Sequence, residues 1–160
     1  MIVALALLAA CGGGGVGNMT IHTGSWPGEW PWFWPEKATF IADGDFSETV
    51  PVAGHHRIRL DAVNGEIVVT GQPGATSVTV TAELVVGSNV SLPDAEKGLN
   101  QLRVLVEDGS NEIVVQTLQP TNLDGRRYVV NYWITVPSDL AVDATQVNGH
   151  VTVEDIEGSL

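Results

Sequence analysis

From residue 38 onward, apolar and polar residues alternate in short segments that are separated by turn-forming residues. A period of two places apolar side chains on one face of a strand, which is typical of half-buried antiparallel strands. Gly, Asn, Asp and Pro between the segments favour tight turns. We therefore predict a β-rich domain over residues 38–160. Its inward-facing residues should include Ile58, Leu60, Ala62, Val78, Val80, Ala82, Leu84, Val104, Val106, Ile134 and Val136, with Trp133 and Thr135 on the opposite face.

One stretch, residues 91–102, departs from the period of two. Ser91 is a candidate N-cap, Pro93 stands in the first turn, and acidic residues follow it. These are the signals that start a helix. Apolar residues then recur at helical spacing, at Ala95, Leu99 and Leu102. The pattern predicts one short helix near 93–102 in an otherwise all-β chain.

The segment 63–69 is repeated at 147–153, with the common pattern Val-Asn-Gly-x-Ile/Val-x-Val. Each copy joins an Asn-Gly turn to a short strand with one apolar face. A unit of this kind cannot bury that face alone, which is why such repeats stack on one another. The alternative is two unrelated Asn-Gly hairpins. We expect tight turns with positive φ at Asn64, Gly65, Asn148 and Gly149.

Residues 38–160 resemble an adhesin-like domain family of unknown function that occurs on bacterial lipoproteins and envelope proteins. The resemblance is carried by residues 58–67, 129–140 and 147–153. It implies antiparallel strands and a short helix that lead into a β-solenoid-like run of Val-Asn-Gly repeats. Members normally carry several coils, whereas this chain stops at Leu160 after a single solenoid-type repeat. The resemblance therefore implies a domain that is truncated at its C-terminus.

The first residues are typical of an export signal. Residues 2–10 form an unbroken apolar run, which is shorter than the about 20 residues that span a bilayer and fits the apolar region of a signal peptide. The following Leu-Ala-Ala-Cys-Gly resembles the bacterial lipobox, which implies removal of 1–10 and a diacylglycerol on Cys11. Cys11 is the only cysteine, so it has no intrachain disulfide partner. No Lys or Arg precedes it; either the start lies upstream of Met1, or the α-amino group serves as the positive charge.

Residues 11–37 are predicted to link the anchor to the domain. A Gly-rich tether runs to residue 23, and a segment rich in Trp and Pro follows it. Proline at this density disfavours both a helix and a central strand. Exposed aromatic rings can stack on sugars or lie at the level of membrane headgroups. Alternatively, they fold back onto the β domain, with Trp133 as the docking surface. The candidate stacking residues are Trp26, Trp30, Trp32 and Trp34.

Charge and motifs exclude several functions. The chain has 7 Lys+Arg against 19 Asp+Glu, a net charge of −12, which argues against binding nucleic acid or anionic lipid through a basic patch. No nucleophile elbow, phosphate-binding loop or zinc-protease motif occurs. We therefore expect no enzymatic activity, no cofactor and no metal site. The histidines, which lack partners at ligand spacing, are His22, His55, His56 and His150.

Together these observations predict a non-enzymatic, lipid-anchored envelope protein that displays an adhesin-like β domain. Cys11 would hold it to the membrane, facing the periplasm or the cell exterior, and its partner would be a surface glycan or an envelope protein. Two alternatives stay open. One is a carbohydrate-binding module that uses the aromatic segment, and the other is a purely structural envelope component.

Overall fold

The computed structural model describes residues 14–15, 18–23 and 38–160, and every structural statement below concerns this part of the chain. It is mostly β-sheet, as predicted, with one short helix among the described residues. The elements are β1 (Gly14–Gly15), β2 (Asn18–Thr23), β3 (Phe40–Pro51), β4 (Arg57–Gln72), β5 (Ser77–Ser88), α1 (Leu92–Leu99), β6 (Arg103–Asp108), β7 (Glu112–Leu118), β8 (Arg127–Pro137) and β9 (Ala141–Glu154).

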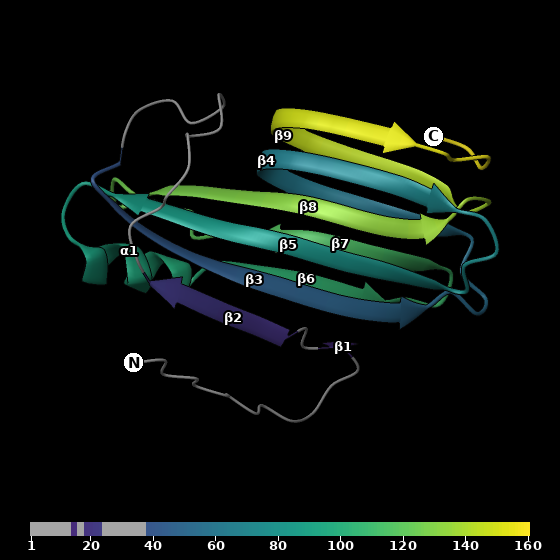
Figure 1. Ribbon diagram of the computed structural model, residues 1–160, viewed down its shortest axis with the longest axis horizontal. Coiled ribbons are helices and arrows are strands. Elements are labelled where there is room, and N and C mark those ends of the chain that lie inside the picture. The colour runs from purple at the N-terminus through teal and green to yellow at the C-terminus, as the bar shows by residue number, and fades with distance from the viewer. Residues whose placement is uncertain (1–13, 16–17, 24–37) are drawn as a thin grey trace.

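The strands form one sheet that is rolled into a nearly closed, flattened barrel (Figure 1). The strand order is β1-β6-β7-β4-β8-β5-β3-β2, and β9 pairs with β4 outside this path. One layer contains β3, β5 and β8, and the other contains β6 and β7. The two layers meet at β4, because its first half pairs with β7 and its second half pairs with β8.

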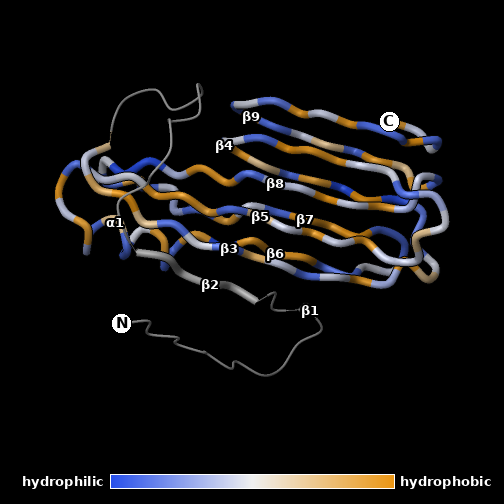
Figure 2. The backbone as a smooth tube through the Cα atoms, in the orientation of Figure 1, coloured by the Kyte–Doolittle hydropathy of each residue, from blue (hydrophilic) through white to orange (hydrophobic). Residues whose placement is uncertain are grey.

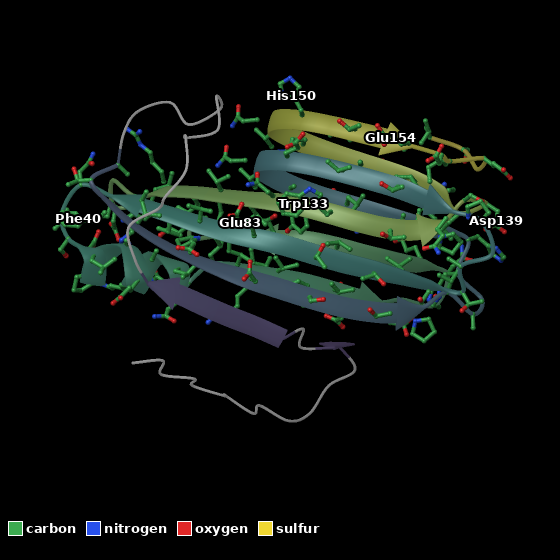
Figure 3. The ribbon with its side chains drawn as sticks, viewed as in Figure 1. Phe40, Glu83, Trp133, Asp139, His150 and Glu154 are labelled. Carbon is green, nitrogen blue, oxygen red and sulfur yellow. The ribbon has the colours of Figure 1, made fainter. Side chains whose placement is uncertain are left out.

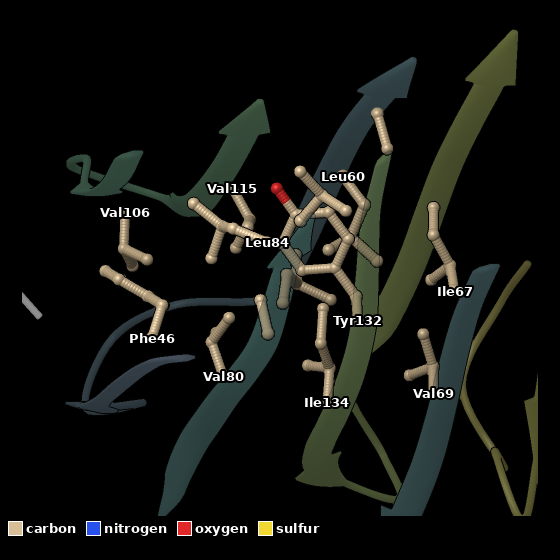
Figure 4. Close-up of a cluster of buried hydrophobic side chains, with 14 of the residues drawn as sticks. Phe46, Leu60, Ile67, Val69, Val80, Leu84, Val106, Val115, Tyr132 and Ile134 are labelled. Carbon is tan, nitrogen blue, oxygen red and sulfur yellow. The ribbon is translucent and has the colours of Figure 1, made fainter. Parts of the chain in front are cut away.

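The apolar residues of the alternating pattern fill the space between the layers. Figure 2 shows hydrophobic and hydrophilic positions alternating along the strands. In β5, for example, Val78, Val80 and Leu84 are completely buried, as predicted. Figure 4 shows side chains of both layers meeting around Tyr132. The Tyr132 hydroxyl lies 2.7 Å from Thr117 Oγ1, and burial raises the pKa of Tyr132 to about 12.

The helix closes one end of the barrel (Figure 1). It starts where the sequence predicts, because the Ser91 hydroxyl accepts a hydrogen bond from the backbone N–H of Asp94 at 3.2 Å. Leu99 and Leu102 are fully buried in the core. The buried Arg126 guanidinium donates to Asp94 Oδ1 at 2.7 Å, which fastens the helix to the sheet and lowers the pKa of the Asp94 carboxyl.

The pairing of β4 corrects one prediction. The alternating segments were expected to form antiparallel strands, and β2–β3, β3–β5, β5–β8 and β6–β7 are antiparallel. However, β4 runs parallel to all three of its partners, β7, β8 and β9. A period of two reports that one face of a strand is buried, and it carries no information on the direction of the neighbouring strand.

The Asn-Gly pairs also differ from the expectation of turns between separate strands. Gly65 and Gly149 have positive φ, +128° and +144°, but Asn64 and Asn148 do not, so the prediction was wrong for the two asparagines. Each pair also lies inside one continuous strand. The chain bends at Gly65, so that β4 passes from one layer to the other. A Cβ atom on Gly65 would lie 2.1 Å from the carbonyl oxygen of Val130. Glycine is therefore required by the close approach of β8 as well as by φ.

We predict that Gly65→Ala lowers the free energy of unfolding by about 2 kcal/mol or more, because the new methyl group must displace backbone atoms of β8. Gly74→Ala is the matched control. Gly74 also has positive φ, +74°, but a Cβ atom there would meet no other part of the chain within 4 Å, so only backbone strain, about 1 kcal/mol, should lower its stability. Urea denaturation measures the free energy of unfolding of both variants. Equal losses of stability would contradict close packing of β8 against the bend at Gly65.

Candidate functional site

The predicted site residues fall into two groups. Cys11, Trp26, Trp30, Trp32 and Trp34 lie outside the described residues. The repeat residues Asn64, Gly65, Asn148 and Gly149 are described, and the structure brings them together. They lie where β4 and β9 bend, at the junction of the two layers (Figure 1).

Strand β9 stacks on β4 in parallel and in register, so that each residue of one repeat meets its equivalent in the other. Asn64 pairs with Asn148 and Gly65 with Gly149. The Asn148 side-chain amide donates to Asn64 Oδ1 at 2.9 Å. Identical residues at identical positions are the arrangement that stacked β repeats require. The two copies of the Val-Asn-Gly pattern are therefore one structural unit placed twice.

Hydrogen bonds hold this bend from both sides. On the side of β8, the Asn64 amide donates to the carbonyl oxygen of Tyr128 at 3.1 Å, and Asn131 Oδ1 accepts the backbone N–H of Glu66 at 3.1 Å. On the side of β9, the Gln146 amide donates to the carbonyl oxygen of Gly65 at 2.9 Å. A Cβ atom on Gly149 would lie 1.7 Å from that same oxygen. Only glycine allows the two bends to stack this closely.

The other side of β9 is a strand edge. Among the described residues β9 pairs with β4 alone. Its backbone groups alternate in direction: the Ala141 N–H donates to His56 on the β4 side, and the Val142 N–H points away, to the carbonyl oxygen of Ser159. We call the outward side of residues 143–153 the β9 edge. In the middle of this segment, Val147 is 68% exposed and Val151 is 40% exposed, whereas Val153 packs partly against the core.

The β9 edge lacks the usual protection of sheet edges. Natural edge strands carry Lys, Pro or bulges that prevent pairing with another chain. Residues 143–153 contain no Lys, Arg or Pro, and their only ionisable residues are Asp143 and His150. This edge can therefore accept a further strand, through backbone hydrogen bonds and the exposed valines.

The described histidines do not form a metal site. The His55 ring lies between two turns, with Nε2 2.8 Å from Asp108 Oδ1 and 2.7 Å from the carbonyl oxygen of Gly109. It links the β3–β4 turn to the β6–β7 turn. Within residues 38–160, no group of three His, Cys, Asp or Glu side chains is placed to bind a metal ion. None of the described helices is long and apolar enough to cross a membrane.

Comparisons with known proteins add no assignment. No family model, no curated protein and no solved structure matches this chain. The resemblance to adhesin-like domains therefore stays a prediction from the sequence motifs, and the functional argument depends on the geometry of the described surfaces.

We predict that the protein with Cys11→Ser self-associates in solution through the β9 edge. Replacing Val147 and Val151 together by Lys should weaken this association about tenfold or more, because buried charge at an edge opposes strand pairing. Val90→Lys is the control, since Val90 is 74% exposed outside β9. Sedimentation velocity over a concentration series measures the effect. If the Cys11→Ser protein without further substitutions is monomeric at every concentration, an adhesive β9 edge is contradicted.

Proposed function

We propose that this protein is a non-enzymatic, lipid-anchored envelope protein that displays an adhesin-like β domain and binds its partner by strand pairing. The observation that supports the proposal most strongly is the in-register stack of β9 on β4, which ends in an uncovered edge. A sheet edge recognises another chain mainly through its backbone, and the side chains then set the specificity.

We propose further that β4 and β9 are successive coils of a β-solenoid-like repeat. Both strands bend at an Asn-Gly pair, and the paired asparagines are hydrogen-bonded. Strand β4 shows which sequence such an edge accepts, because its outer side already pairs with β9, a strand of the Val-Asn-Gly pattern. The partner that best fits the β9 edge is therefore another strand of the Val-Asn-Gly pattern, which would extend the row of stacked asparagines.

The proposed anchor explains how the domain would be displayed. A diacylglycerol on Cys11 would hold the chain at the membrane, and the Gly-rich segment after it would give the domain reach. The domain would then face the periplasm or the cell exterior. With a net charge of −12, it is unsuited to nucleic acid and would not lie on anionic lipid by charge.

We predict that Cys11→Ser moves the protein from the membrane fraction to the soluble fraction, because the lipid would be its only stable attachment. Gly13→Ser, which keeps the cysteine, should stay with the membrane. Fractionation of the producing bacterium followed by a carbonate wash measures both. If the Cys11→Ser protein still pellets with the membranes after the wash, then a lipid on this cysteine is not what attaches the chain to the membrane.

A further inference from the structure

The outer face of the β3–β5–β8 layer carries a regular array of side chains around Trp133. Strand register places Thr81 of β5 and Val68 of β4 directly beside Trp133. Directly paired residues share one face of a sheet, and the alternate residues here, such as Tyr132 and Ile134, are buried. Trp133 therefore points away from the core, at the centre of this layer (Figure 3).

Trp133 is 46% exposed, and it is the only large aromatic residue among the exposed hydrophobic residues of the described part. The others are aliphatic: Val90, Leu118, Leu123, Val147, Val151 and Leu160. The indole ring presents a flat apolar surface, with Thr81 beside it on β5 and Val68 beside it on β4. Such a surface suits a ligand that has one flat apolar face and polar edges.

The row of side chains on one side of Trp133 consists of carboxylates and an amide. Glu83 of β5 lies opposite Asn131 of β8, and the Asn131 amide nitrogen donates to Glu83 Oε2 at 3.0 Å. The Asn131 oxygen is in turn fixed by the backbone N–H of Glu66 at 3.1 Å. These bonds orient the Glu83 carboxylate on the same face as the indole ring (Figure 3).

The row on the other side of Trp133 is made of hydroxyl groups. Four threonines lie side by side across four strands, and the hydroxyls of the first two are 3.3 Å apart. Neighbouring strands are about 4.8 Å apart, and residues on the same face of a strand about 6.8 Å apart, so both polar rows lie roughly one sugar ring from Trp133. The row consists of Thr49, Thr79, Thr135 and Thr70.

We propose that Trp133 is the centre of a binding site for an uncharged glycan. The apolar face of a pyranose ring would stack on the indole, while its hydroxyls bond to the Glu83 carboxylate and to the threonine row. The carboxylates of Glu83 and Glu66, in a chain of net charge −12, disfavour sulfated, uronic or sialic sugars. This site lies on the face of the sheet, so it is independent of strand pairing at the β9 edge.

A cationic peptide is the competing ligand, because Lys or Arg can also bind an aromatic ring beside a carboxylate. The observations favour the glycan. The threonine row offers neutral hydroxyls across four strands of this face, and Glu83 already shares a hydrogen bond with a neutral amide. The two ligands differ in their dependence on salt, which screens ionic binding and leaves stacking and neutral hydrogen bonds nearly unchanged.

The test uses the full chain with Cys11→Ser on an array of neutral, sulfated and sialylated glycans, with poly-lysine as the cationic probe. We expect binding to neutral glycans that persists at high salt. Trp133→Ala should weaken it about tenfold or more, Glu83→Gln less, and Trp133→Phe should retain part of it. Leu118→Ala is the matched control, because Leu118 is also 46% exposed but lies in β7, in the other layer.

Three results would overturn the site: no neutral glycan binds; only poly-lysine binds, and salt removes it; or binding survives Trp133→Ala and is lost when Trp30, Trp32 and Trp34 are replaced by Ala. The third result would assign sugar binding to the aromatic segment instead. Thermal unfolding of Trp133→Ala, whose side chain lies outside the core, should match that of the wild type and show that loss of binding is not loss of fold.

Discussion

The bend of β4 at Gly65 is the constraint on which the rest of the structure depends. Because β4 pairs with β7 before the bend and with β8 after it, this one strand joins the two layers that enclose the core. The bend leaves no room for a side chain, since backbone oxygens of Val130 and Gly65 lie against the two stacked glycines. Strand β9 repeats the bend residue by residue, so the geometry of β4 also determines the edge that β9 presents.

The sequence predicts the local features of this fold well, because they depend on burial and on neighbouring residues. Alternation identified the buried faces of β5 and β8, and the cap at Ser91 identified the helix. Pairing direction and closure of the sheet could not be predicted in this way. They depend on contacts between segments far apart in the chain, such as β4 with β7, for which a period of two carries no signal.

The candidate sites show the same division. The equivalence of Asn64 and Asn148 is visible in the sequence as a repeat. The repeat alone therefore indicates that these two residues stack on each other. Trp133 was placed correctly on the face opposite Ile134, but the sequence suggested it only as a docking surface for the aromatic segment. Glu83 and the threonine row are up to 86 residues apart in sequence and become neighbours only through strand register. No spacing in a single sequence reports that proximity.

The two proposed surfaces differ in the chemistry that they offer. The β9 edge offers backbone groups and exposed valines, which fit another β-strand. The Trp133 face has no unpaired backbone edge and offers a flat ring between rows of polar side chains, which fits a sugar. A domain displayed on a cell envelope could use the first surface to assemble with protein and the second to hold polysaccharide.

Residue-specific hydrogen exchange in β9 tests the central claim most directly, namely that β9 stacks on β4 and leaves its outer edge open. The Ala141 N–H points to β4 and the Val142 N–H points away, so direction alternates along the strand. The amide protons of Asp143 and Thr145 should exchange slowly, and those of Ala144 and Gln146 should exchange fast. Slow exchange at all four would show a covered edge, and fast exchange at all four would show that β9 is not stacked on β4.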